Sequence, residues 1–497
     1  MKRHLIFTIF ILFTFSLSAQ NDSMGIKQFV IKIDERIPQL LEDFLVPGAV
    51  IGIIENGKII LQKGYGFSDI EKGIKVSTKT GFNIGSISKT VAAWGIMKLV
   101  QEGKIDLDAP AEKYLTRWHL PKSDFDSNKV TIRRLLSHTA GLSLHGYPGW
   151  SPNDELPTIE ESLNGINNGP GRVEIIMEPG TMWKYSGGGF TILQLIIEEV
   201  TGKKFEDYMQ TEILNPLGMT NSSYKIDESI LNLSSNEYNG FGEQIDFELF
   251  TAKAAAGLHT TIEDFTIFAQ ASLYKSENYN QQVLSTAYVE QMMMPEPESK
   301  GIYGLGYQVE SIPNTDIILK GHGGANDGWQ ALFMVNDITN DGCIMFTNGG
   351  AGYNIYSQIF CEWMQWKKGE PSNDNCKRAP SIANQIKHII DVEGIDSINS
   401  NYFELKKNEL DKYNFSEEQL NALGYFYLKN DEIQNSIAVF KLNVEAFKNS
   451  FNVYDSYGEA LLKGGFKTEA IENYKKSLEL NPENENALQV LKKLGVN

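Results

Sequence analysis

The hydrophobic pattern predicts strands near both ends of a large N-terminal region. Residues 50–54 and 58–61 are short apolar runs separated by Asn56-Gly57, a dipeptide typical of a β-hairpin with a type I′ turn. Three later apolar runs have the length and β-branched or aromatic content of strands, and they are centred near Ile317, Leu332 and Ile344. Strands at both ends, with helices between them, predict one mainly antiparallel sheet that the terminal segments close.

Helical patterns fill the space between these strands. Residues 91–100 are apolar around most of a helix circumference, as expected for a buried helix, and Gly103 is a suitable stop signal. A second apolar helix is predicted to start at Phe190, and a third is predicted over residues 355–366. The pattern therefore indicates an α+β domain in which helices pack on a sheet.

The pattern changes after residue 369. Residues 369–375 have the turn-forming composition of a linker, and beyond them the chain is helical. Three pairs of similar residues lie 34 positions apart, namely Gly424 and Gly458, Ile437 and Ile471, and Phe440 and Tyr474. This period and the ending Leu480-Asn481-Pro482 resemble tetratricopeptide repeats.

Such repeats bury their apolar faces only by stacking, and about three are needed for stability. Two are clear here, so we expect the helices of residues 383–410 to complete the stack, or the array to lean on the first domain. Two roles stay open for this region, a packing appendage and a surface that docks a protein partner.

The first residues have the pattern of a secretory signal peptide. Lys2 and Arg3 precede an apolar stretch of 13 positions, residues 5–17, and Ala19-Gln20 is a suitable cleavage point. The stretch is shorter than the roughly 20 residues that cross a bilayer as a helix. We therefore expect export to the periplasm or secretion, with no membrane span after cleavage.

Composition excludes some classes of function. The 497 residues are enough for two or three domains. The formal net charge is −18, and an acidic protein is repelled by phosphate backbones, so no nucleic-acid partner is expected. Cys343, Cys361 and Cys376 are too few for a disulfide framework. A Cys361–Cys376 bridge stays open, and the odd count leaves one thiol outside any pair within the chain.

Ser86-Ile-Ser-Lys89 is the first candidate for chemistry, because it joins the strand-like run 82–85 to the buried helix. A serine hydroxyl becomes a good nucleophile only when a neighbouring base removes its proton. Residues i and i+3 share a helix face, so the Lys89 amine can reach the Ser86 hydroxyl. Lysine acts as a base only when it is neutral. Lowering its pKa from about 10.4 to about 7–8 costs about 4 kcal/mol, which burial must supply.

The same spacing occurs twice more. Ser222 and Lys225 lie in a polar stretch that reads as a loop, and Ser272 and Lys275 fall near the end of an amphipathic helix. Neither pair follows a strand, so only Ser86 has the strand–turn–helix setting.

Two further segments could supply partners to Ser86. Tyr185 precedes a glycine run at the predicted start of an apolar helix, and His322-Gly323-Gly324 lies between two predicted strands. No His-Glu-x-x-His or Cys-x-x-Cys motif is present, so neither a metal nor another cofactor is expected.

These three elements, in this order, resemble the motifs of the serine β-lactamase and penicillin-binding-protein superfamily. The class C-like branch, with its D-aminopeptidases, carboxypeptidases and esterases, is the most similar. Residues 46–49, 135–142 and 303–307 also resemble family segments, and the resemblance spans roughly residues 27–366. It implies an antiparallel sheet flanked by helices, with a helical subdomain inserted. The expected organisation is a signal peptide at 1–19, a hydrolase domain at 24–368, a linker at 369–382 and a helical domain at 383–497.

The resemblance also implies roles for single residues. Ser86 would be the acylated nucleophile, Lys89 its general base, and Tyr185 the group that passes protons to the leaving group. The backbone N–H groups of Ser86 and Ala325 would form the oxyanion hole, in which each donor contributes roughly 3–4 kcal/mol. The substrate-binding positions would be His322, Gly323, Gly324 and Gly187.

Two positions depart from the family pattern. Gly187 stands where the family has the asparagine of Tyr-x-Asn, and His322 stands where true β-lactamases commonly have lysine. Both changes argue against efficient penicillin hydrolysis and favour an ester, a peptide or a D-amino-acid amide as substrate. The alternatives are a true β-lactamase or D-Ala-D-Ala carboxypeptidase, and a non-enzymatic sensor that is acylated without turnover while its repeats recruit a partner.

Overall fold

The computed structural model describes residues 14–166, 169–275, 283–369 and 376–496. Residues 1–13, which carry most of the predicted signal peptide, lie outside this range, and so do residues 370–375 of the predicted linker. The chain divides into two compact units, Met1–Cys376 and Lys377–Asn497. Among the described residues, no helix combines the length and hydrophobicity that a bilayer crossing requires.

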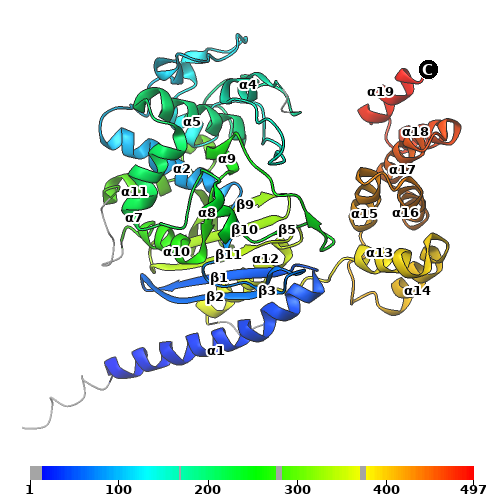
Figure 1. Cartoon of the computed structure of the whole chain (residues 1–497), viewed down its shortest axis with the longest axis horizontal. Helices are drawn as coiled ribbons and strands as arrows, with labels where there is room; N and C mark the ends of the chain where they lie inside the picture. The colour runs from blue at the N-terminus through cyan, green and yellow to red at the C-terminus, as the bar shows by residue number, and fades with distance from the viewer. Residues whose placement is uncertain (1–13, 167–168, 276–282, 370–375, 497) are drawn as a thin grey trace, which may run out of the picture. The chain divides into compact units, whose positions relative to one another are not determined.

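A seven-stranded antiparallel sheet organises the first unit, in the order β3-β2-β1-β11-β10-β9-β8 (Figure 1). Its strands are β1 (Gly48–Glu55), β2 (Lys58–Asp69), β3 (Ile74–Lys75), β8 (Gln308–Ser311), β9 (Ile318–Asn326), β10 (Trp329–Asn336) and β11 (Asp341–Thr347). Because β1 pairs with β11, strands from the two ends of the unit meet in the middle of the sheet. The predicted closure of the sheet is confirmed. The predicted hairpin is confirmed too, since Asn56 and Gly57 both have positive φ between β1 and β2.

Among the described residues, four strands of two or three residues lie outside this sheet. They form two small antiparallel pairs, β4 (Gly81–Asn83) with β7 (His259–Thr261) and β5 (Glu237–Tyr238) with β6 (Gln244–Ile245). The helices of the unit are α1 (Thr14–Asp43), α2 (Ile87–Gln101), α3 (Ile132–Leu136), α4 (Ile159–Asn164), α5 (Gly187–Thr201), α6 (Phe205–Met209), α7 (Asn215–Leu217), α8 (Glu228–Leu233), α9 (Lys253–Ala256), α10 (Ile262–Ala271), α11 (Thr286–Met293) and α12 (Tyr353–Lys367).

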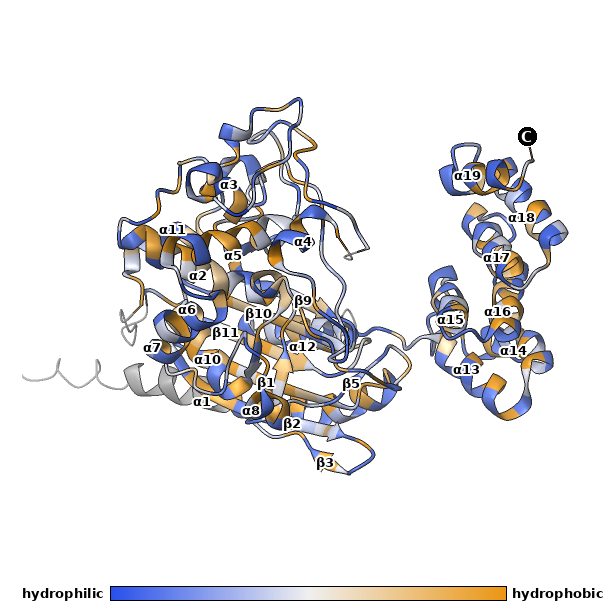
Figure 2. Ribbon diagram, turned by 45° about the horizontal axis from the view of Figure 1, so that its top comes forward, coloured by the Kyte–Doolittle hydropathy of each residue, from blue (hydrophilic) through white to orange (hydrophobic). Residues whose placement is uncertain are grey.

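Strands β1, β10 and β11 are buried along almost their whole length, and Figure 2 shows that they are mainly hydrophobic. Alternate residues of a strand point to opposite faces. On β1, Val50 and Ile54 join the core shared with α2, α5 and α10, whereas Ile51 and Ile53 join the core shared with α1 and α12. Helices therefore cover both faces, which is the α+β architecture that the sequence predicts.

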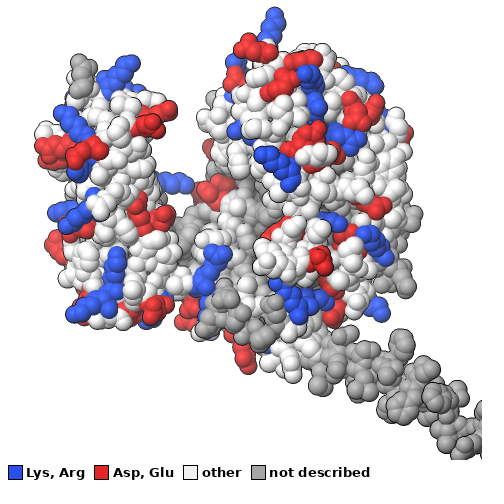
Figure 3. All heavy atoms as spheres, turned by 180° about the vertical axis from the view of Figure 1, so that it is seen from behind, with Lys and Arg blue, Asp and Glu red and all other residues white. Residues whose placement is uncertain are grey.

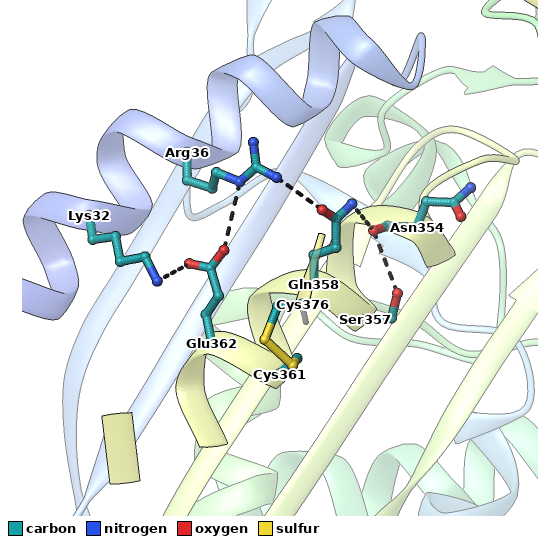
Figure 4. Close-up of a disulfide and its surroundings, with 8 residues drawn as sticks. All are labelled: Lys32, Arg36, Asn354, Ser357, Gln358, Cys361, Glu362 and Cys376. Carbon is teal, nitrogen blue, oxygen red and sulfur yellow. Dashed lines mark hydrogen bonds and ion pairs between the residues drawn. A yellow bond between two sulfur atoms is a disulfide. The ribbon is translucent and has the colours of Figure 1, made fainter. Parts of the chain in front are cut away.

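Helix α1 was not predicted, and it is held against α12 by packing and by charge (Figure 4). Phe29 stacks on Trp366 with ring centroids 4.8 Å apart. Lys32 Nζ lies 2.7 Å from the buried Glu362 carboxylate, and Arg36 donates to the Gln358 side chain at 3.0 Å. Figure 4 also shows the disulfide between Cys361 of α12 and Cys376, which fixes the end of the unit to its last helix.

The second unit is made only of helices among its described residues, and two of its helix pairs repeat the same contact. The helices are α13 (Ile382–Glu393), α14 (Ile398–Asn408), α15 (Glu417–Lys429), α16 (Ile433–Ala446), α17 (Phe451–Lys463), α18 (Lys467–Leu480) and α19 (Glu485–Lys493). Gly424 of α15 lies against the Phe440 ring of α16, and Gly458 of α17 lies against the Tyr474 ring of α18. These are the residues that the sequence places 34 apart. The tetratricopeptide assignment itself stays a prediction.

Candidate active site

Ser86 occupies the turn between β4 and α2. Gly85 makes this turn with a φ of +51°, and Ser86 is the residue immediately before the helix. A side chain at Gly85 would lie 2.5 Å from the Ala325 nitrogen, and one at Gly324 would lie 2.0 Å from the Ile84 carbonyl oxygen. Glycine at both positions therefore lets strand β9 pass directly beside the serine.

Lys89 lies one helical turn further along α2 and contacts Ser86. Its Nζ is 3.1 Å from Ser86 Oγ and donates to the Ala255 carbonyl oxygen of α9 at 2.7 Å. The lysine side chain is 2% exposed, whereas Ser86 is half-buried and reaches the cavity described below. The amine is thus held against the hydroxyl and shielded from water.

Burial sets the charge of Lys89. Taking an ammonium group out of water disfavours its charged form, and this lowers the pKa of Lys89 from its ordinary value to about 7. A substantial fraction of the amine is therefore neutral at physiological pH, and a neutral amine can accept the serine proton.

Tyr185 contacts both Lys89 and Ser86. Lys89 Nζ is 4.9 Å from the centre of the Tyr185 ring, and the tyrosine hydroxyl is hydrogen-bonded to Ser86. Burial raises the pKa of Tyr185 well above its ordinary value, against the opposite influence of the Ser86 hydrogen bond. The phenol therefore keeps its proton and can relay protons as a hydroxyl group, while Lys89 is the group suited to be the base.

Polar side chains fix the serine turn to the neighbouring segments. Asn83 Oδ1 accepts from the Gly85 N–H at 2.8 Å and from Asn326 Nδ2 at 2.7 Å. The Asn83 and Asn326 amides both donate to the Ala256 carbonyl at 3.1 Å. This network joins β4, β9 and α9, so the nucleophile, the strand beside it and the acceptor of Lys89 are held together.

The placement of Ala325 fits the predicted oxyanion hole. The Gly323 N–H donates to the Gln308 side chain on β8, away from β10. Alternate N–H groups of a strand point the same way, so the Ala325 N–H also points away from β10, toward the edge where Ser86 lies. The Ser86 N–H is at the start of α2, where amides have no carbonyl partner within the helix. Both predicted donors are therefore available at the cavity.

A cavity of about 410 Å³ opens above Ser86 and Lys89. Its walls come from the 145–149 loop, the 248–256 segment and the start of the β9–β10 hairpin, and its lining residues are Ser86, Lys89, His145, Gly146, Tyr147, Pro148, Gly149, Glu248, Phe250, Ala252, Ala255, Ala256, Ala325, Asn326, Asp327 and Gln330. The sequence analysis did not identify His145, Glu248 or Asp327 as site residues. They come from loops whose sequence has no motif, so only the three-dimensional structure brings them to Ser86.

His322 differs from its expected role. It is 1% exposed and does not line this cavity; its Nε2 is 2.9 Å from the Tyr303 hydroxyl, and its Nδ1 faces the Gly323 carbonyl. Burial and the nearby Lys89 lower the pKa of His322 to about 3, so the imidazole is neutral. His322 therefore packs against Tyr303 outside the cavity and offers no positive charge to a substrate.

The three glycines assigned to substrate binding also lie outside the cavity lining. Gly323 and Gly324 belong to β9 beside the serine turn. At Gly187, the backbone N–H donates to the His145 carbonyl oxygen at 2.9 Å, and a Cβ would lie 2.7 Å from the same oxygen. The 145–147 loop therefore fills the space into which the family's asparagine would project.

The other two Ser-x-x-Lys pairs are accounted for by structure. Ser222 is buried and donates to the Asp264 carboxylate at 2.8 Å. Ser272 is buried against the Tyr307 hydroxyl at 2.8 Å, while Lys275 pairs with Asp337 at 2.9 Å. Neither serine contacts the lysine of its own motif, so neither is an activated nucleophile.

Comparison with known proteins agrees with this geometry. The family model described as Beta-lactamase matches residues 33–354, more than half of the chain. This protein therefore belongs to the β-lactamase family, within the serine β-lactamase and penicillin-binding-protein superfamily.

Individual relatives are distant. The chain is 26% identical over 332 residues to Protein flp of Staphylococcus aureus (strain MRSA252), an alignment that covers 65% of this chain and 63% of the relative. Among solved structures, the octameric penicillin-binding protein homologue from Pyrococcus abyssi superposes with a TM-score of 0.58 at 25% identity, over 73% of this chain and 81% of the other. SurE has the same fold, with a TM-score of 0.57 at 20% identity, over 72% of this chain and 82% of the other.

Proposed function

We propose that this protein is an exported class C-like serine hydrolase that cleaves an ester or an amide of the peptide or D-amino-acid type through an acyl-enzyme on Ser86. The observation that carries the proposal is the buried Lys89 amine, 3.1 Å from Ser86 Oγ, with its pKa lowered to about 7. A nucleophile with a base in hydrogen-bond contact is the minimum that covalent acyl transfer requires.

The reaction follows from the contacts. Ser86 Oγ attacks the substrate carbonyl carbon while its proton passes to the neutral Lys89 amine. The carbonyl oxygen becomes an oxyanion that accepts from the Ser86 and Ala325 N–H groups. Collapse of the intermediate breaks the bond to the leaving alcohol or amine, which takes a proton relayed from Lys89 by the Tyr185 hydroxyl. Lys89 and Tyr185 then deprotonate a water molecule, which attacks the carbonyl carbon of the acyl-enzyme ester. The bond to Ser86 Oγ breaks, and Ser86 recovers its proton from the same two groups.

The alternative of a true β-lactamase or carboxypeptidase has less support. Recognition of a substrate carboxylate needs a fixed positive charge, and His322 is buried and neutral at the position where one is expected. Restoring the family's asparagine at Gly187 is blocked by the His145 carbonyl. The neutral His322 favours substrates that lack a carboxylate beside the scissile bond, and the block at Gly187 excludes the side-chain amide that the family's asparagine would supply.

One experiment separates the enzymatic and the sensor hypotheses. One portion of the full chain is incubated with a fluorophosphonate and analysed by peptide mass spectrometry. A separate, untreated portion is tested for turnover of a panel of short-chain esters, nitrocefin and D-alanyl peptides. We expect a single adduct on Ser86 together with turnover of esters or peptides. A stable adduct without turnover of any substrate would favour a sensor.

The serine variants make the result specific. Ser86→Ala should abolish both the adduct and turnover, while Ser272→Ala, which removes a hydroxyl from another Ser-x-x-Lys motif, should retain both. Activity that survives Ser86→Ala in a folded protein would overturn the proposal.

Export and a partner belong to the same proposal. The Cys361–Cys376 disulfide supports an oxidising compartment such as the periplasm or the extracellular space. The repeated helix-pair contacts at Gly424 and Gly458 support a tetratricopeptide-like surface that could dock a protein. Fractionation of the producing cell and pull-down with the full chain test these two points.

A further inference from the structure

His138 is a buried titratable group beside the active site to which the proposed reaction gives no role. It follows helix α3 and is 2% exposed. Its φ of +58° lies in the left-handed region, where few residues other than glycine are found. Backbone held in such a conformation beside an active site is a reason to look for a function there.

The polar groups of His138 hold the chain on both sides of Tyr185. The His138 carbonyl oxygen accepts from the Lys184 N–H at 2.8 Å. The imidazole Nδ1 accepts from the Ser186 N–H at 3.1 Å, and this second hydrogen bond is buried. A single residue therefore fixes the backbone immediately before and immediately after the tyrosine.

The imidazole also packs directly on the tyrosine. The ring centroids of His138 and Tyr185 are 4.2 Å apart, with an angle of 39° between the ring planes. The rings of Tyr303 and Phe190 lie 4.8 Å and 5.3 Å from the imidazole. These aromatic neighbours confine the imidazole, so the surface that it presents to Tyr185 is fixed.

The contact with Ser186 requires a neutral imidazole. Because Nδ1 accepts a hydrogen bond, the ring proton is on Nε2, which is buried without a hydrogen-bond partner among the described residues. Burial lowers the pKa of His138 well below its ordinary value, and the nearby Lys89, His322 and His145 lower it further. Near neutral pH the imidazole thus stays uncharged and keeps its acceptor.

The segment that carries His138 is tied to helix α2. The Leu136 carbonyl oxygen accepts from the Gly306 N–H at 3.1 Å, and the Gly306 carbonyl oxygen accepts from the Thr90 hydroxyl at 2.8 Å. Helix α2 begins directly after the nucleophile and carries its base. The residue that fixes the tyrosine is therefore itself fixed to this helix, and a misplacement of about 1 Å between such groups can cost catalysis about 10²-fold.

We propose that His138 is a positioning residue, which holds the Tyr185 hydroxyl on Ser86 through the hydrogen bond that Nδ1 accepts from the Ser186 N–H. This inference rests on the proposed serine hydrolase function and on the relay role of Tyr185. His138 does not line the cavity, so it acts through the tyrosine and not on the substrate.

The test uses two esters of the same acid that differ in their need for the relay. An ethoxide leaving group must be protonated as it departs, whereas 4-nitrophenolate departs as an anion. The acid is the one whose esters the parent protein hydrolyses fastest. Because both esters form the same acyl-enzyme, the ratio of their kcat/KM values reports the proton transfer to the leaving group.

Substitutions of His138 separate its acceptor from its bulk. His138→Leu removes the acceptor, and kcat/KM for the ethyl ester should fall at least about 10-fold, while the value for the nitrophenyl ester changes less than about threefold. His138→Ala, which also lacks the acceptor, is measured beside it, in case the larger side chain prevents folding. His138→Asn keeps an acceptor and suits a positive φ, so both values should stay within about threefold of the parent protein.

Two controls make the effect specific. His119→Leu replaces an exposed histidine outside the cavity and should leave both values unchanged. In Tyr185→Phe the relay is already absent, so the addition of His138→Leu should lower kcat/KM for the ethyl ester by less than about threefold more. A residue that only stabilised the fold would affect both esters equally and would act independently of Tyr185.

The outcomes distinguish the positioning role from the hydrolase function. Fluorophosphonate labelling of Ser86 is measured in every variant, since its fluoride leaving group needs no relay. Labelling together with equal loss on the two esters, or a His138→Asn that behaves like His138→Leu, would overturn the positioning role and leave the hydrolase function intact. Independent effects of the His138 and Tyr185 substitutions would also overturn it. Absence of labelling at Ser86 in the folded parent protein would overturn the hydrolase function and this inference with it.

Discussion

Burial acts in opposite directions on the two ionisable groups that contact Ser86. It lowers the pKa of Lys89 to about 7 and raises the pKa of Tyr185 further above neutral pH. In each case the uncharged form of the group is favoured out of water. At pH 7 the Tyr185 phenol is therefore neutral, and so is a substantial fraction of the Lys89 amine. A neutral amine is a base and a neutral phenol is a proton relay, so one physical cause assigns two roles.

Replacement of Tyr185 by phenylalanine tests the relay. The ring would keep its packing against His138, 4.2 Å away between centroids, while the hydroxyl bonded to Ser86 is lost. We expect kcat on esters to fall by about 10²–10³, measured by steady-state kinetics with a thermal unfolding curve as control. An unchanged kcat would remove Tyr185 from the reaction.

The sequence predicts single site residues well only where a motif is local. Ser86 and Lys89 are three residues apart on a helix, and their contact follows from helix geometry. The inward direction of His322 could not be predicted, because it depends on Tyr303, which is 19 positions away and enters from another segment. Glu248 and Asp327 line the cavity but belong to no motif, so only the fold brings them to Ser86.

At the scale of elements, the first turn of α5 packs closely against the 145–147 loop. Gly187, Gly188 and Gly189 start this helix. Gly187 has the His145 carbonyl against it, whereas the nearest atom to a Cβ at Gly189 would be a Leu135 methyl group at 3.6 Å, an ordinary contact. A side chain therefore fits at Gly189 but not at Gly187, although both glycines lie in the same helical turn.

Alanine at these two positions should have opposite effects. Gly187→Ala should reduce the free energy of unfolding by about 1–3 kcal/mol, because the loop backbone must move. Gly189→Ala is the matched control and should be neutral or stabilising by up to about 1 kcal/mol, since alanine favours the helix. Denaturant unfolding of both variants measures this, and equal destabilisation would contradict the close approach of the 145–147 loop.

The elements that were predicted have strong local signals, and the missed ones do not. Asn56-Gly57 defines the β1–β2 hairpin, and the apolar run of α2 defines a buried helix. Helix α1 has apolar residues at helical spacing, with Phe29, Ile33 and Ile37 in the core, but Pro38 interrupts the signal because proline is unfavourable inside helices. Apart from β4, which the strand-like run 82–85 indicated, the two-residue and three-residue strands are too short to have a period.

At the scale of the whole molecule, charge and covalent links bear on where the protein works. On the face that Figure 3 shows, acidic and basic groups are interspersed on both units, so the excess of negative charge is not gathered there into one patch. The disulfide closes a loop of 15 residues at the end of the first unit, and Cys343 is a free thiol buried in β11. These features suit the exported hydrolase proposed above.

Alkylation with iodoacetamide tests the state of the cysteines. Without reductant the native protein should take up no label, because burial raises the pKa of the Cys343 thiol to about 12 and keeps it unreactive. After mild reduction we expect two labels, at Cys361 and Cys376. Labelling of these two cysteines without reductant would contradict the disulfide.

The disulfide should also stabilise the protein. Replacing both Cys361 and Cys376 by serine should reduce the free energy of unfolding by about 3 kcal/mol, the value expected for a 15-residue loop. Denaturant unfolding of the variant and the parent protein measures the difference. Equal stability would show that α12 holds the segment without the covalent link.

The pH dependence of Ser86 acylation most directly tests the claim that a neutral Lys89 activates the serine. The second-order rate of fluorophosphonate labelling is measured from pH 5 to 9, with the labelled residue identified by mass spectrometry. Below its pKa of about 7 the amine is protonated and cannot accept a proton, so the rate should rise with pH to a plateau, with a midpoint near 7. In Lys89→Met the rate should be lower by about 10²–10⁴ and should lose this transition. A midpoint that persists in Lys89→Met, or a rate that is the same at pH 5 and pH 9 in the parent protein, would contradict the account.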